Sequence, residues 1–273
     1  MKRLFDIFIS LLGLVILSPV LLTFMYLVYR QDKHSPFYVA SRVGKNGVMF
    51  KMLKLRSMSV NADKSGVDST SADDIRITPI GHKIRRYKLD EFTQLWNVLI
   101  GDMSLVGPRP NVLSDTNLYT DIEKGLLTVR PGITDFSSIV FSDEGDILEG
   151  MKDPDLAYNQ LIRPWKSRLG LSYIKNQSLF LDFQLILYTV IAIISKQRAL
   201  AWVAVKLNNL NVDTDTVKIS KREVSLYPFP PPGSDEIVSS RWFEFSFASI
   251  NTASVIFLTQ LVSVLKYPAE YQP

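Results

Sequence analysis

Two adjacent carboxylates, Asp90 and Glu91, are the residues of this sequence best suited to chemistry on a phosphate. Together they could hold a Mg²⁺ ion, which offsets their repulsion toward a diphosphate, and one of them could attack phosphorus to form a mixed anhydride. Taken alone, the pair is better explained as a helix cap, because Asp and Glu each stabilise a helix start by ~1 kcal/mol. The cations just upstream, Arg85, Arg86 and Lys88, favour the chemical interpretation.

Further cations could complete a site for a diphosphate. Arg109 lies between Pro108 and Pro110, which restrict its backbone, and a guanidinium can bind a phosphate through two parallel hydrogen bonds. A structural ion pair explains Arg109 equally well. The other candidates are cations that, taken singly, are better explained as solvated surface charges: Lys45, Lys54, Arg56 and Arg130.

The composition limits the chemistry that the chain can perform. It has 273 residues, 47% of them hydrophobic, which is enough for one substantial core. It contains no cysteine, which excludes thiolate catalysis, disulfides and cysteine-bound zinc. Its two histidines, His34 and His82, have no metal-ligand spacing, so a bound metal would be oxygen-ligated, such as Mg²⁺. The net charge of +4 suits phosphates or anionic lipid, and no nucleic-acid-binding motif accompanies it.

The first apolar stretch, residues 4–29, is long enough to cross a bilayer as a helix. It is longer than the core of a secretory leader and no small-residue cleavage site follows it, so we expect it to be retained. Ser18 and Pro19 lie near its middle, where a proline bends a helix. Both ends are basic, whereas a spanning helix usually keeps its basic flank on the cytoplasmic side. A re-entrant helix broken at Ser18-Pro19 fits both features, and a kinked spanning helix stays open.

Periodicity and turn residues predict a mainly helical α+β domain after this segment. The expected elements, in chain order, are a β-hairpin over residues 36–58, a polar loop over 59–75, a helical stretch over 84–99 in which Asp90 could start a second helix, stiff turns at 107–110 and 130–132, helices in pieces over 153–173, and an interfacial or core helix over 183–194. A polar stretch over 208–234 ends in a proline-rich run that predicts a linker. The last apolar stretch, 247–265, could be a membrane-associated helix or a small helical cap.

Several motifs together resemble the bacterial sugar transferases known as monotopic phosphoglycosyl transferases. The resemblance covers roughly residues 1–200 and is most specific over 89–110, LDEFTQLWNVLIGDMSLVGPRP. The other matching motifs are Lys2-Arg3-Leu4-Phe5-Asp6, the Ser18-Pro19 break, Arg42-Val43-Gly44-Lys45-Asn46-Gly47, Lys54-Leu55-Arg56-Ser57-Met58 and Arg130-Pro131-Gly132-Ile133-Thr134. After Thr134 many relatives read Gly-Trp-Ala-Gln, whereas this chain has Asp135-Phe136-Ser137-Ser138, so the sugar is not inferred from the resemblance.

The resemblance implies a monotopic membrane protein with an N-terminal re-entrant helix and a small cytosolic catalytic domain, on the cytoplasmic face of the bacterial inner membrane. Such an enzyme uses Mg²⁺ to transfer a sugar 1-phosphate from a UDP-sugar to undecaprenyl phosphate and releases UMP. This is the first membrane step of exopolysaccharide, O-antigen (lipopolysaccharide), capsule or glycoprotein glycan synthesis. Asp90 would form a covalent aspartyl-phosphosugar intermediate, and Glu91, with Asp90, would bind the metal. The expected phosphate-binding residues are Arg85, Arg109, Lys54, Arg56 and Arg130.

The expected division of the chain is a re-entrant membrane helix over residues 1–30, a catalytic sugar transferase domain over 31–206, and a linker and tail of unknown role over 207–273. Two other functions stay open. A membrane glycosyltransferase releasing UDP needs a metal motif such as Asp213-Thr214-Asp215, which we expect in a solvated loop. A non-enzymatic membrane scaffold of glycan assembly would use Asp90 and Glu91 only as a helix cap. Membrane lipid is an expected partner. The sequence leaves open whether the protein forms a homo-oligomer.

Overall fold

The structure, a computed structural model, describes residues 1–62 and 74–239. It confirms the predicted mainly helical α+β fold, which contains two small two-stranded sheets. The apolar stretch at 247–265 lies outside the described residues, as does most of the predicted polar loop at 59–75.

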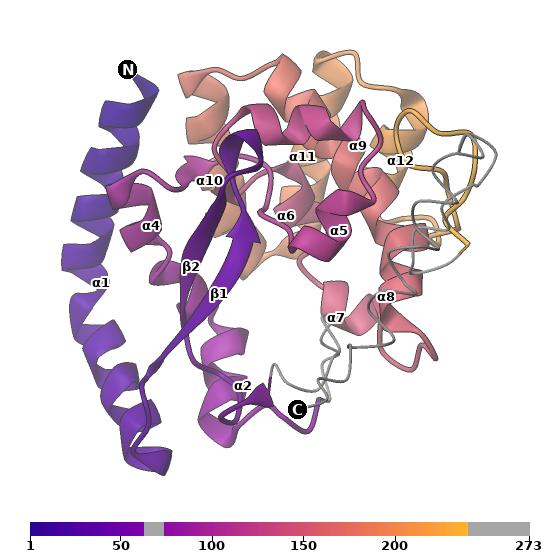
Figure 1. The fold of residues 1–273 in the computed structure, drawn as a ribbon. Helices are drawn as coiled ribbons and strands as arrows, with labels where there is room; N and C mark the ends of the chain where they lie inside the picture. Colours follow the sequence, from indigo (N-terminus) through magenta and orange to yellow (C-terminus); the bar gives the residue numbers. More distant parts are fainter. Residues whose placement is uncertain (63–73, 240–273) are drawn as a thin grey trace, which may run out of the picture. The chain divides into compact units, whose positions relative to one another are not determined.

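The N-terminal apolar segment forms one helix, α1 (Lys2–Asp32), which is long and apolar enough to cross a membrane by length and composition. It runs along one side of the fold beside α4 (Leu95–Ile100), as Figure 1 shows. Half of its apolar side chains are exposed, among them Leu4, Phe8, Leu11, Val15, Ile16, Leu22 and Tyr26. An exposed surface of this kind requires a membrane or a partner to cover it.

Pro19 lies inside α1 without ending it. Proline lacks the amide hydrogen that would bond to the carbonyl of Val15, four residues earlier. The Ser18 hydroxyl donates to that carbonyl instead, at 2.7 Å. Thr23 likewise donates its hydroxyl to the carbonyl of Pro19, at 2.8 Å. The predicted break is therefore a point where side chains replace a missing backbone hydrogen bond, and the re-entrant path stays a prediction.

The start of α1 is attached to the core by three polar side chains. Lys2 pairs with the buried carboxylate of Asp182 at 2.6 Å and donates to the carbonyl of Val106 at 3.1 Å. Arg3 donates to the carbonyls of Val98 and Leu99 in the last turn of α4. Asp6 accepts from the Ser104 hydroxyl at 2.9 Å and from the next backbone amide at 3.2 Å.

The other end of α1 is attached to the hairpin. Arg56, which follows the second strand, donates to both carboxylate oxygens of Asp32 at 2.5 and 2.7 Å and to the carbonyl of Ser35 at 2.8 Å. Both ends of the apolar helix are thus held by the same folded unit.

The predicted hairpin is confirmed. Strands β1 (Phe37–Val43) and β2 (Met49–Leu55) pair antiparallel, with Phe37 opposite Leu55. Gly47 closes the turn at φ 78°, a conformation that glycine adopts without strain. Thr93 and Asn97 donate side-chain hydrogen bonds to the carbonyls of Leu53 and Lys51, which joins β2 to the helices of the next segment.

The predicted helical stretch over 84–99 is three short helices. They are α2 (Pro79–Arg86), α3 (Leu89–Phe92) and α4. The second sheet follows, in which β3 (Ser104–Val106) and β4 (Gly132–Thr134) are parallel. Gly107 and Gly132 touch so closely that a Cβ on Gly132 would lie 2.1 Å from the Gly107 nitrogen. The two predicted stiff turns therefore lie side by side.

The remaining helices build the core, and they include the predicted helices in pieces over 153–173. In chain order they are α5 (Leu113–Asn117), η3 (Glu123–Thr128), α6 (Phe136–Val140), α7 (Glu144–Ile147), α8 (Pro154–Ala157), η4 (Tyr158–Ile162), α9 (Arg163–Lys175), α10 (Leu179–Ile194), α11 (Lys196–Asn209) and α12 (Thr214–Lys221). α10 buries Leu181 and Leu185 and exposes Phe180, Phe183 and Val190. It is therefore both a core helix on one face and an apolar surface on the other.

The proline-rich run expected in a linker packs on α9. It belongs to residues 225–239, which we call the strap. Phe229 stacks on the buried Trp165, with ring centroids 4.4 Å apart, and Arg168 donates to the carbonyl of Pro230 at 2.9 Å. The division of the chain at residues 30 and 206 stays a prediction.

Replacing Asp6 with Ala should test the attachment of α1. Because two buried donors lose a charged acceptor, we expect the free energy of unfolding to fall by about 2–3 kcal/mol. Thermal unfolding of the detergent-solubilised protein measures this. Leu4→Ala, at an exposed position of the same helix, is the matched control and should change little. Equal losses in both variants would contradict the anchoring role of Asp6.

Candidate active site

Asp90 and Glu91 lie in the first turn of α3. Arg109, from the loop after β3, donates from Nη2 to Glu91 Oε1 at 3.0 Å. The Asp90 carboxylate makes no hydrogen bond or ion pair with any residue in 1–62 or 74–239. Lys88, with a φ of 55°, occupies the N-cap position, and no side chain caps α3. Neither carboxylate therefore makes a capping hydrogen bond, although both lie in the first turn, where a negative charge stabilises the helix start.

Electrostatics separate the two carboxylates. Burial raises the pKa of Asp90, and the positive charge of Lys54 opposes that rise. Burial also acts to raise the pKa of Glu91, but the charges of Arg109 and Lys88 outweigh it and the pKa is lowered. Glu91 is thus an ionised group fixed by Arg109, whereas Asp90 is a partly desolvated carboxylate without a protein partner.

Lys54 is the third charged group of the site. It lies on β2, next to the point where Thr93 joins that strand to α3. Burial, together with the charge of Arg109, lowers the pKa of Lys54 to about 8, although Asp90 and Glu91 act in the opposite direction. Its ammonium group is therefore close to its titration point at neutral pH.

The other predicted phosphate-binding residues divide into two groups. Arg85 donates from Nε to the Ser57 hydroxyl at 3.0 Å, and the charge of Asp90 acts on its pKa, so it belongs to the surroundings of the dyad. Arg56 is held by Asp32. Arg130 is exposed and donates to the carbonyl of Gly101 at 2.7 Å. Arg56 and Arg130 are thus engaged elsewhere in the fold, and a contact of theirs with phosphate stays a prediction.

Lys88 was noted as a cation just upstream of Asp90 but not among the phosphate-binding residues, and it lowers the pKa of Glu91. One charged residue of the site was not predicted at all. Glu144 on α7 forms an ion pair with Lys166 and helps to raise the pKa of Arg109. No local pattern in the sequence distinguishes Glu144, because its proximity to Arg109 arises only from the tertiary fold.

The alternative metal motif lies at the start of a helix. Asp213 accepts from the backbone amide of Thr216 at 2.8 Å and is the N-cap of α12. Asp215 lies in the first turn and pairs with Lys218 at 3.5 Å. These contacts account for both aspartates as helix-stabilising residues, and they give the UDP-releasing alternative no support.

Comparison with known protein families identifies the family of the chain. The chain matches the bacterial sugar transferase family over residues 1–196, and it belongs to that family. It is 35% identical over 193 residues, 69% of this chain, to the UDP-glucose:undecaprenyl-phosphate glucose-1-phosphate transferase of Klebsiella pneumoniae. It is 34% identical over 207 residues, 70% of this chain, to the exopolysaccharide production protein ExoY of Sinorhizobium fredii.

A third relative is the undecaprenyl-phosphate galactose phosphotransferase of Salmonella typhimurium, 32% identical over 214 residues, or 73% of this chain. The match spans 39% of the Klebsiella protein and 41% of the Salmonella protein, but 84% of the Sinorhizobium protein. The chain therefore spans less than half of the length of two of these three relatives.

The pKa of Lys54 predicts an alkaline limb in the pH profile of activity. As the pH rises through about 8, the ammonium group loses its proton and its attraction for a substrate diphosphate, so kcat/KM should fall. Lys54→Arg keeps its charge at high pH and should move this limb upward. Lys51→Arg, at an exposed position of the same strand, is the control and should leave it in place. An unchanged limb in Lys54→Arg would contradict the assignment.

Proposed function

We propose that the chain is a phosphoglycosyl transferase that moves a sugar 1-phosphate from a UDP-sugar to undecaprenyl phosphate and releases UMP. The observation that carries the proposal is the Asp90 carboxylate, unpartnered among the described residues and placed beside Lys54 and Arg109. A carboxylate that no protein group engages is available to attack phosphorus, and cations around it stabilise the charge of a transferring phosphoryl group. The relatives' names describe transfer of glucose 1-phosphate or of a galactose phosphate involving undecaprenyl phosphate, which supports the substrate class.

In the first proposed step, a carboxylate oxygen of Asp90 attacks the phosphorus that bears the sugar. The bond from that phosphorus to the UMP oxygen breaks, and UMP leaves with the electron pair. In the second step, an oxygen of the lipid phosphate attacks the same phosphorus, and Asp90 departs as a carboxylate. Arg109 and Lys54 would bind the phosphate oxygens in both steps, and the contact with Glu91 fixes the guanidinium of Arg109.

The donor set fits Mg²⁺. Adjacent carboxylates are hard oxygen ligands, and proteins commonly bind Mg²⁺ through one or two carboxylates plus substrate phosphates. The described residues contain no cluster of three or more His, Cys, Asp or Glu that could hold a metal unaided. Asp90 and Glu91 would therefore hold the ion together with the substrate. Bound there, it would neutralise the negative charge of the diphosphate.

We also propose a monotopic arrangement on the cytoplasmic face of the inner membrane. The support is that both ends of α1 are held by one folded unit, Lys2 by Asp182 and Asp32 by Arg56. A helix whose ends are both attached to one body on one side of a bilayer enters and leaves by the same face. The exposed apolar face of α10 would add contact with the lipid surface.

Asp90→Asn should abolish transfer while leaving the fold intact. Asn has nearly the same shape but is no nucleophile, so UMP release should fall at least a thousandfold with UDP-sugar, undecaprenyl phosphate and Mg²⁺. Intact-protein mass should show a sugar phosphate adduct on the wild type and none on Asp90→Asn. Asp121→Asn, at an exposed position, is the matched control. Release of UDP in place of UMP, or retained turnover in Asp90→Asn, would refute the mechanism.

The absence of cysteine from the sequence allows a clean topology test. Single cysteines are introduced at His34 and in a short extension ahead of Met1, and intact spheroplasts are treated with a membrane-impermeant maleimide. A re-entrant helix places both cysteines on the cytoplasmic side, so both should react only after lysis. Reaction of one of the two in intact spheroplasts would establish a spanning helix instead.

A further inference from the structure

The loop that carries Arg109 continues into a buried polar network. Two residues further on, Asn111 donates from its side chain to the hydroxyl of Tyr119 at 2.7 Å. Its backbone carbonyl accepts from the amide of Val43 at 3.0 Å. Pro110 separates Arg109 from Asn111 and fixes one backbone angle between them. The position of Asn111 therefore determines much of the position of Arg109.

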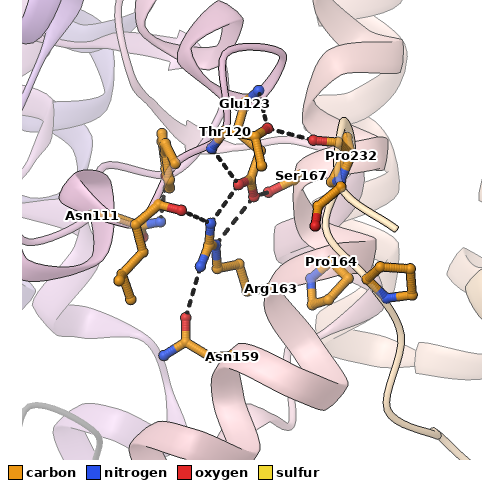
Figure 2. A network of polar contacts seen from close by, with 12 residues as sticks. Asn111, Thr120, Glu123, Asn159, Arg163, Pro164, Ser167 and Pro232 are labelled. Atoms are coloured by element: carbon orange, nitrogen blue, oxygen red, sulfur yellow. Dashed lines mark hydrogen bonds and ion pairs between the residues drawn. The ribbon is translucent and has the colours of Figure 1, made fainter. Parts of the chain in front are cut away.

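Tyr119 rests on a buried ion pair. The guanidinium of Arg163 lies over the Tyr119 ring, 5.5 Å from its centroid. Arg163 donates from Nε to Glu123 Oε1 at 3.1 Å and from Nη2 to the other carboxylate oxygen (Figure 2). At most 1% of either side chain is exposed. Such a pair holds its geometry strongly, because separating its members leaves a buried charge without a partner.

The network around Glu123 is saturated with donors. The Ser167 hydroxyl donates to Oε1 at 2.7 Å, and the amide of Thr120 donates to Oε2 at 3.1 Å (Figure 2). The Thr120 hydroxyl in turn accepts from the amide of Glu123 at 3.1 Å, which completes a reciprocal cap. Arg163 also donates from Nη1 to the side chain of Asn159 at 3.1 Å. A fully paired network of this kind is rigid and has one arrangement.

The strap contacts the network on its outer side. The Thr120 hydroxyl donates to the carbonyl of Pro232 (Figure 2), and the amide of Phe229 donates to the carbonyl of Gln160 at 3.1 Å. Gly233 packs against Ile122, so close that a Cβ on this glycine would meet the Ile122 side chain at 3.0 Å. The strap lies beyond residue 196, where the match to the family ends. The contacts that the strap makes with the network therefore come from residues outside the region that matches the family.

We propose that this network, from the strap through Glu123 and Arg163 to Tyr119 and Asn111, positions Arg109 for the substrate diphosphate. Tyr119 and Asn111 are positioning residues that act through the loop. The proposal rests on the proposed function, in which Arg109 binds the phosphates. A displacement of about 1 Å at such a group can cost a large factor in rate, so a rigid support far from the chemistry has a direct effect on turnover.

Tyr119→Phe tests the proposal, because it removes the hydroxyl and keeps the ring on Arg163. We expect kcat/KM for the UDP-sugar to fall about tenfold, mainly through a higher KM, with the thermal unfolding temperature within a few degrees of the wild type. Asn111→Ala removes the same hydrogen bond from its other end, so the double variant should be no worse than either single variant. Tyr227→Phe is the matched control: its ring packs against Trp165, and among residues 1–62 and 74–239 its hydroxyl makes no hydrogen bond.

Hydrogen exchange of the amides over residues 104–112 gives a readout independent of activity. Exchange in this segment should rise in Tyr119→Phe and in Asn111→Ala, but not in Tyr227→Phe. Unchanged kinetics and exchange in the two variants, or losses that add in the double variant, would overturn the positioning role. A wild-type protein that exchanges as expected but releases no UMP would refute the proposed function alone.

Discussion

The attachment of an apolar helix to the polar candidate active site is the constraint on which the rest of this structure depends. Arg3 binds the end of α4, which directly follows the helix of Asp90 and Glu91. Asp6 and Lys2 bind the two ends of β3, which leads to Arg109. The first six residues therefore connect the membrane segment to both halves of the site. Movement of α1 relative to the core would shift Glu91 away from its partner Arg109.

Much of the fold was predictable because its signals are local. The apolar N-terminal helix, the hairpin around Gly47 and the helical spacing before Leu99 each depend on residues a few positions apart, and the structure confirms them. Asp90 became a candidate for the same reason, since the carboxylate next to it and the cations just before it stand close in the sequence, but its predicted role as nucleophile came from the family resemblance. The helices are interrupted at Lys88, and the sequence indicated this only through a possible helix start at Asp90.

The contacts that could not be predicted from the sequence join residues that are far apart along the chain. Arg56 belongs to a motif that suggests phosphate binding, yet Asp32 engages it once the hairpin returns to the end of α1. Glu144 stands in no recognisable motif, and its influence on Arg109 depends on where α7 lies in the folded chain. The proline-rich run had the composition of a linker, but Trp165 offers it a stacking surface that no local pattern reveals. Charge pairing and aromatic stacking between distant segments follow from the fold and not from spacing.

The two attachments of α1 also bear on how the protein would respond to the lipid around it. A spanning helix must match the thickness of the bilayer, and it tilts or distorts the lipid when it does not. A helix fixed at both ends to one body has no such freedom to tilt. In the proposed re-entrant arrangement, its fit would depend on the depth of a single leaflet, so the composition of the opposite leaflet would matter little. The hydroxyl of Ser18, by satisfying the Val15 carbonyl, would allow the deepest part of the helix to stay in hydrocarbon without an exposed polar group.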